Sequence, residues 1–234
     1  MPLSHSVGHV SGAHLNPSIS FAFALIDHKD FGWRRFGYYV LAQFVGAFLG
    51  SLLVWSLFSG AVAHYEGVNN MVRGQPGSER TAMMFGEYFP NPASYPNQNE
   101  VIGIGQAFWA EMLGTAFLAF VIFSVTAPCN NVIPPNFAPL FIGFTVSIII
   151  SLIAPLTQAG LNPARDFSPR LLALILGWGD IAIPGPRNGF WIYLLAPMLG
   201  APIGGFLANV CIQRPCKSTE ACYELVACSE KKDD

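Results

Sequence analysis

The chain contains 234 residues, of which 52% are hydrophobic and 11% are charged, against roughly 25% charged residues in soluble domains. One globular core of this length cannot hide so much apolar surface, so the composition indicates a polytopic membrane protein. The formal net charge of −2 gives no broad basic face, which excludes a nucleic-acid partner. No cysteine or histidine cluster has metal-ligand spacing, so neither a metal nor another cofactor is expected.

The first predicted element is a short apolar helix over residues 17–26. Asn16 is a good N-cap, and Pro17 stands at the first helical position, where proline is favoured. About ten residues cannot cross a hydrocarbon core of roughly 30 Å. The segment is therefore predicted to be a re-entrant half-helix, which is tolerated at membrane depth only where protein buries it or water wets it.

Four longer segments are predicted to cross the membrane. The stretch 36–63 carries no Asp, Glu, Lys or Arg, and a second such stretch, 112–164, is interrupted by turn residues that divide it into two spans. After the last span, Arg214 and Lys217 mark the return to water. The spans cover residues 36–63, about 103–126, 138–157 and about 189–212.

A second short segment, 163–176, also begins with Asn-Pro, at Asn162 and Pro163, and is predicted to be another half-helix. The stretch 64–100 is polar and is predicted to form an ordered external loop. The tail 213–234 is polar, contains cysteines and is predicted to be disordered.

Two sets of matching residues indicate an internal repeat. Residues 13–18 and 159–164 agree at four of six positions, at an offset of 146 residues. Residues 39–42 match 193–196, and each match is followed by a pair of glycines four residues apart, a pattern suited to close helix packing. Those pairs are Gly46 with Gly50 and Gly200 with Gly204.

The repeat is predicted to be inverted, because counting the crossings makes the two half-helices enter from opposite sides. Two spans precede the second half-helix, whereas about fifteen residues precede the first. Most of the first two spans are therefore expected to be missing from the front of the chain.

These residues resemble the major intrinsic proteins and, among them, the glycerol facilitators or aquaglyceroporins. The string SGAHLNPS over residues 11–18 is similar to the first signature loop of that family, and LNPARDFSPR over 161–170 to the second. Asp166 after Arg165 is characteristic of the glycerol-conducting branch. The resemblance covers about residues 5–212.

The resemblance implies an all-α membrane protein with an aquaporin-like inverted repeat, in which two re-entrant half-helices meet at mid-membrane. It implies a channel domain over residues 1–212, with an incomplete first repeat, followed by the tail 213–234. It also implies homotetramers surrounded by lipid, in the plasma membrane, with a cytoplasmic C-terminus. Lys29 and Arg35 lie on the same side as Arg214, which agrees with that orientation.

The expected function is passive conduction of glycerol, other small neutral solutes and water, without enzymatic chemistry. Two half-helix N-termini would place roughly half a positive charge each at the pore midpoint, which excludes protons and other cations. The amides of Asn16 and Asn162 would donate to passing oxygens, and Arg165 would hold hydroxyl groups and add a second positive barrier. Backbone carbonyls of His14, Leu15, Ala159, Gly160 and Leu161 would accept hydrogen bonds from the solute.

Other residues at the site are expected to be structural. Pro17 and Pro163 would fix the starts of the half-helices, and Glu111 and Asp166 would be buried carboxylates that accept hydrogen bonds from the re-entrant loops. Three departures from the family pattern concern the pore. Ser18 stands where alanine is usual, Ile150 where glycerol channels carry glycine, and Ala159 where they carry an aromatic residue.

Two alternative functions remain open at this point. A truncated, non-conducting subunit could modulate full-length channels by lateral assembly. A coupled secondary transporter can also use inverted repeats and broken helices, although no lone carboxylate in a span is available to bind a driving ion.

Overall fold

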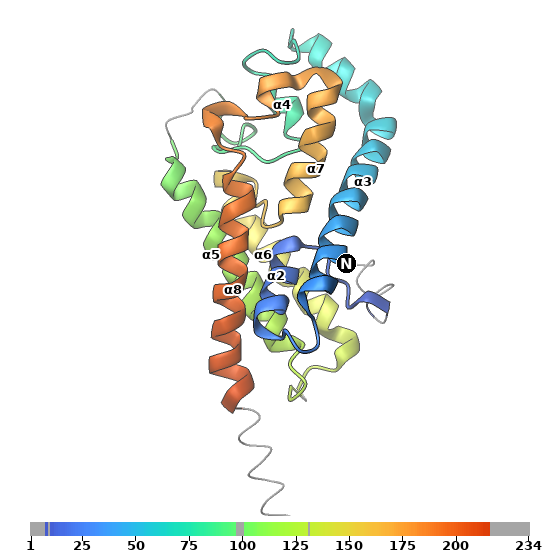
Figure 1. Ribbon diagram of the computed structural model, residues 1–234. Helices are drawn as coiled ribbons and strands as arrows, with labels where there is room; N and C mark the ends of the chain where they lie inside the picture. Colours follow the sequence, from blue (N-terminus) through green and yellow to red (C-terminus); the bar gives the residue numbers. More distant parts are fainter. Residues whose placement is uncertain (1–7, 9, 97–100, 131, 216–234) are drawn as a thin grey trace, which may run out of the picture.

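The computed structural model describes residues 8, 10–96, 101–130 and 132–215 (Figure 1). Every regular element in these ranges is a helix. The α-helices are α2 (Pro17–Ile26), α3 (Trp33–Val68), α4 (Glu79–Ala82), α5 (Ile104–Val125), α6 (Ala138–Thr157), α7 (Pro163–Ala173) and α8 (Ile192–Ala208). Single 3-10 turns lie at Pro135–Phe137, Gly179–Ile181 and Pro186–Asn188, and π-helical turns at Leu174–Trp178 and Asn209–Gln213.

The four predicted spans are confirmed. Four helices, or helices extended by their flanking turns, are long and apolar enough to cross a membrane. The first exceeds its prediction at both ends, since α3 has 36 residues and runs past residue 63 to Val68. No proline interrupts that last stretch, and the carboxylate of Glu66 is bound by Arg73, so a charge there does not end the helix.

Both half-helices begin where the sequence predicts. The side chain of Asn16 accepts from the Ser18 amide at the start of α2, and Asn162 accepts from the amides of Ala164 and Arg165 at the start of α7. In Figure 1, α2 runs downward from the middle of the molecule and α7 runs upward. The two short helices therefore enter from opposite ends, as an inverted repeat requires.

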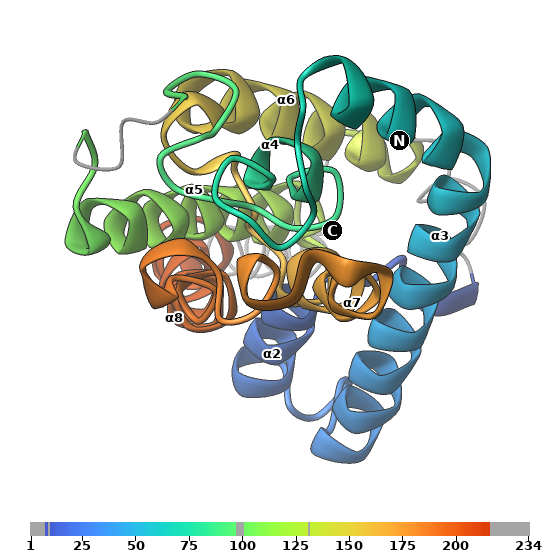
Figure 2. The same cartoon turned by 90° about the horizontal axis from the view of Figure 1, so that it is seen from above.

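One of three hydrophobic clusters in the described residues lies among α2, α5, α6 and α8, whose arrangement is seen from above in Figure 2. Leu118 and Ala201 are buried there, and the ring of Phe23 stacks on Phe123 with centroids 4.2 Å apart. Close contact depends on Gly200 and Gly204. A Cβ at either position would overlap the backbone of α5.

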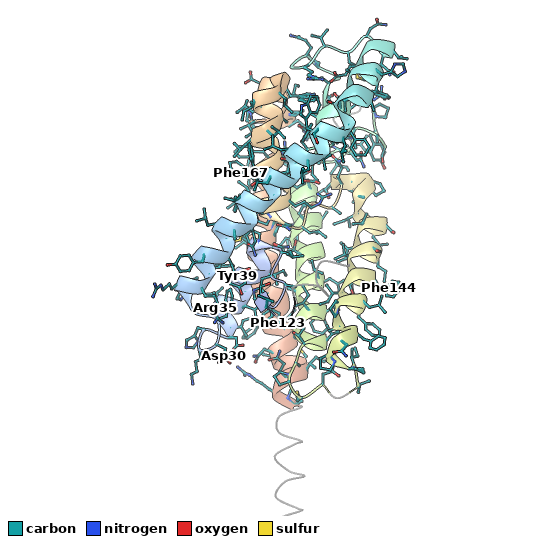
Figure 3. All side chains as sticks on the ribbon, turned by 90° about the vertical axis from the view of Figure 1, so that its right-hand side faces the viewer. Asp30, Arg35, Tyr39, Phe123, Phe144 and Phe167 are labelled. Carbon is teal, nitrogen blue, oxygen red and sulfur yellow. The ribbon has the colours of Figure 1, made fainter. Side chains whose placement is uncertain are left out.

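The matching glycine pair of α3 is not packed in this way, because a Cβ at Gly46 or Gly50 would meet nothing within 4 Å. The outward faces of α3 and α6 are apolar. Leu53 is 67% exposed and Leu152 is 70% exposed, and Figure 3 shows Phe144 pointing away from the bundle. Such faces suit contact with lipid.

Charged residues gather at the two opposite ends of the molecule. Asp30 and Arg35 lie at the lower end in Figure 3, whereas α4, which carries Arg80, lies at the upper end in Figure 1. The predicted external loop is ordered over residues 69–96, and positions 97–100 lie outside the described residues. The predicted tail also lies outside them from residue 216 onward.

Candidate functional site

The two half-helix N-termini meet and exchange a pair of hydrogen bonds. Asn16 Nδ2 donates to the carbonyl oxygen of Leu161 at 2.8 Å, and Asn162 Nδ2 donates to that of Leu15 at 2.9 Å. Each partner is thus the residue that precedes the other asparagine. A side-chain amide has two N–H groups, so each asparagine keeps one donor beyond this exchange.

The loops that lead into the half-helices share an unusual backbone conformation. Gly12 and Gln158, each four residues before the asparagine, have φ of 69° and 64°. Ala13 and Ala159, each three residues before it, have φ of 53° and 58°. Left-handed conformations at non-glycine residues cost on the order of 1–3 kcal/mol each, so other contacts must hold these loops.

A buried carboxylate holds the second loop. Glu111 of α5 is fully buried and accepts from the amides of Gly160 at 3.0 Å and Leu161 at 2.7 Å. Its Oε1 also accepts from Thr157 Oγ1 at 2.6 Å. Gly160 is required because a Cβ there would come within 2.7 Å of the Tyr193 ring. Glu111 therefore contacts the re-entrant loop as the sequence predicts.

The first loop is held by neutral groups of α3. Gln43 Nε2 donates to the carbonyl oxygen of His14 at 2.6 Å, and Tyr39 Oη donates to that of Ser11 at 2.9 Å. The His14 ring packs against Phe23, with ring centroids 4.6 Å apart. The His14 carbonyl, a predicted acceptor for solute, is thus already bonded to α3 and keeps one lone pair.

Arg165 lies in the first turn of α7, and its side chain is 49% exposed. Its Nη1 forms an ion pair with Glu87 Oε1. A carboxylate thus compensates the charge of the arginine, a contact that the expectation of a second positive barrier did not include. Glu87 was not found by sequence reasoning, since a glutamate in a polar loop 78 positions away carries no motif.

Asp166 is also placed differently from its prediction. It is fully buried, accepts from the Glu87 amide at 2.7 Å and forms an ion pair with Arg170 at 2.8 Å. It thus bonds the loop that follows α3 rather than a re-entrant loop. Arg170 in turn donates to the carbonyl oxygens of Glu87 and, at 2.9 Å, Ala182.

The neighbouring Tyr88 forms further hydrogen bonds that hold the loop after α3. Its amide donates to Gln158 Oε1 at 2.7 Å and its hydroxyl to the Ile181 carbonyl at 3.0 Å. Burial raises the pKa of Tyr88 to about 12, so the phenol stays protonated and able to donate.

A cavity of about 220 Å³ lies beside the Arg165–Glu87 pair. Its lining includes the apolar side chains of Val54, Met83 and Phe85 together with the charged pair. The remaining predicted side chains differ in exposure. Ile150 is 40% exposed on α6, whereas Ala159 is 2% exposed, so its side chain is withdrawn from any passage. Within the described ranges, no group of three His, Cys, Asp or Glu side chains could hold a metal ion.

Comparisons with known proteins point to one family. The sequence profile described as Major intrinsic protein matches residues 2–208. The chain is 39% identical to the glycerol uptake facilitator protein of Pseudomonas aeruginosa, over 91% of this chain and 73% of that protein. It is 32% identical to aquaporin-7 of Rattus norvegicus, over 87% of this chain and 70% of that protein.

The fold matches a solved structure as well. The aquaglyceroporin from Plasmodium falciparum superposes with a TM-score of 0.67 at 25% sequence identity. The match covers 86% of this chain and 74% of that one.

Proposed function

The chain belongs to the major intrinsic protein family, and we propose that it conducts glycerol through a passage formed at its two half-helix N-termini. It is a multi-pass integral membrane protein and a passive channel for glycerol and other small neutral solutes, and for water. No covalent step is part of this function.

The observation that supports the site is the reciprocal bonding of Asn16 and Asn162. The exchange fixes both amides, and each directs its second N–H into the passage, where it donates to an oxygen of the solute. A water bound to two such donors cannot pass its proton along a hydrogen-bonded chain. The two helix N-termini add a positive potential that opposes cations.

Backbone groups supply the acceptors along the passage. The left-handed residues Ala159 and Leu161 turn the second loop so that its carbonyls, with that of Gly160, face the solute. Leu15 keeps one lone pair after accepting from Asn162, whereas the Leu161 carbonyl oxygen accepts from Asn16 and also lies 3.5 Å from the Ser18 hydroxyl. Arg165 donates to hydroxyl groups at one entrance, and Ile150 borders the passage from α6.

The exposed apolar surfaces support the proposed assembly. Residues 1–212 form the channel domain, and the tail beyond it is cytoplasmic, on the same side as Lys29 and Arg35. The apolar outer faces of α3 and α6 contact lipid or neighbouring subunits of a homotetramer in the plasma membrane.

A coupled transporter is disfavoured because the three buried carboxylates of the site already have partners. Glu111 is bonded to the second loop, Asp166 to Arg170 and Glu87 to Arg165, so each is held by another group rather than by a driving ion.

Stopped-flow light scattering of proteoliposomes tests the proposal. We expect the chain to accelerate glycerol equilibration well above empty vesicles, linearly with the gradient and without response to ionophores. Flux that saturates and collapses with an ion gradient would instead identify a transporter. A chain that conducts nothing alone and lowers the flux of a co-reconstituted relative would identify a modulating subunit.

A further inference from the structure

Four charged side chains on or beside α7 form two compensated pairs, and one of these pairs lines the cavity. Arg165 is paired with Glu87, and Arg170 is paired with Asp166. The formal charges of these four groups cancel. An ion that approaches the cavity beside Arg165 therefore meets an ion pair rather than an isolated cation.

Glu87 is fixed in place more firmly than a loop residue usually is. Its side chain is 5% exposed, its amide donates to Asp166 Oδ1, and its carbonyl oxygen accepts from Arg170. The next residue, Tyr88, is bonded through its amide to Gln158. Because the backbone is bound on both sides, Glu87 stays at the wall of the cavity when its partner is lost.

A buried carboxylate that loses the cation it is paired with is left with an uncompensated negative charge, which is costly in a poorly solvated site. Glu87 Oε2 is itself buried, and it has no hydrogen-bond partner within the described part of the chain. Removal of Arg165 would therefore leave a fixed negative charge at the wall of the entrance cavity, where it attracts cations.

We propose that Glu87 is the charge partner of Arg165, so that cation exclusion depends on the half-helix N-termini and not on the arginine. This inference rests on the proposed function. Its consequence is that any cation leak caused by loss of Arg165 comes from the orphaned Glu87 carboxylate. Removal of both side chains restores neutrality and suppresses the leak.

Proteoliposomes that contain the full chain provide the test, with potassium flux and glycerol flux measured on the same preparations. We expect Arg165→Ala to raise potassium leak about tenfold, a factor that corresponds to about 1.4 kcal/mol. We expect the double variant Arg165→Ala with Glu87→Ala to return the leak to within about twofold of the wild-type chain. Equal leaks in the single and double variants, or no leak in the single variant, would overturn the proposal.

A second variant tests the same ion pair if Arg165→Ala does not fold or insert into the membrane. Glu87→Gln keeps the shape of the side chain but leaves Arg165 uncompensated, so we expect nitrate permeability to rise about tenfold while potassium leak does not rise. Unchanged nitrate permeability would overturn the inference.

The Glu66–Arg73 pair supplies a matched control. It is also an ion pair between an arginine and a buried glutamate, at 2.9 Å, but neither residue lines the entrance cavity. Arg73→Ala should therefore cause no potassium leak. An equal leak in this variant would show that loss of any loop ion pair loosens the protein, which also overturns the proposal.

Glycerol flux through the wild-type chain distinguishes failure of the proposed function from failure of this inference. Absence of glycerol flux from the wild-type chain would overturn the proposed function together with this inference. Normal glycerol flux with the wrong pattern of leaks would overturn the inference alone.

Discussion

The two loops that lead into the half-helices end in the same way but are held in place by different side chains. Both are capped by an asparagine, and both place left-handed residues three and four positions before it. The second loop is held by the buried carboxylate of Glu111, whereas Gln43 and Tyr39 hold the first through neutral groups. Short-range sequence thus determines where each half-helix begins, while distant helices determine how firmly its loop is held.

Among the substitutions that test this difference between the loops, loss of Glu111 should have the largest effect on stability and glycerol flux. In Glu111→Ala, the buried amides of Gly160 and Leu161 lose their acceptor, at a cost of roughly 1–3 kcal/mol each. We expect a large fall in the midpoint of thermal unfolding in detergent and loss of glycerol flux. Glu111→Gln, which keeps one acceptor oxygen, serves as the control and should lose less. Wild-type unfolding of the alanine variant would show that the second loop needs no anchor.

The paired glycines of the two repeats give the next largest contrast. Gly204→Ala would place a methyl group on the backbone of Ala116, so we expect α8 to separate from α5, at a cost of about 1–3 kcal/mol or more. Gly50→Ala meets nothing within 4 Å and gains helix propensity of up to about 1 kcal/mol. Thermal unfolding of the two variants should shift in opposite directions. A loss of stability in Gly50→Ala would show that the α3 face is packed against a neighbour in the assembled protein.

Much of the fold could be predicted because its signals are local. Charge-free stretches define the spans. Asn-Pro defines the start of each half-helix, and α2 and α7 do begin at Pro17 and Pro163 in the structure. The prediction for Glu111 was also accessible, because a carboxylate inside a span needs donors and a re-entrant loop has unpaired amides.

The entrance could not be predicted, because it is built by contacts between distant segments. Glu87 lies in a polar loop and Arg165 in α7, far apart in the sequence. No repeat or periodic pattern connects the two positions, so the sequence does not indicate that they pair. The bond from Gln43 to His14 likewise depends on how α3 lies against the first loop. In both cases the residue types were visible, and only the tertiary arrangement shows which of their polar atoms are already bonded.

Gln43 tests whether the first loop depends on its anchor as the second does. Gln43→Ala removes the hydrogen bonds to the His14 carbonyl and to Ser20 Oγ, at about 0.5–1.5 kcal/mol each. Because no buried charge is involved, we expect a moderate fall in glycerol flux and a smaller shift in unfolding than for Glu111→Ala. Hydrogen exchange over residues 10–16 should rise. Collapse of flux equal to that of Glu111→Ala would make the two anchors equivalent.

The smallest effect should come from Ser18, which stands where the second repeat has Ala164. Its hydroxyl donates to Asn16 Oδ1 at 2.6 Å, an oxygen that already accepts from the Ser18 amide at 2.9 Å. Ser18→Ala therefore removes a surplus bond and makes the first cap match the second, so we expect unfolding to change by less than about 0.5 kcal/mol and glycerol flux by less than about twofold. Asn16→Ala, which removes the cap itself, is the positive control. A large loss in Ser18→Ala would mean that the hydroxyl orients the Asn16 amide toward Leu161, and the two caps would then differ in mechanism despite their shared geometry.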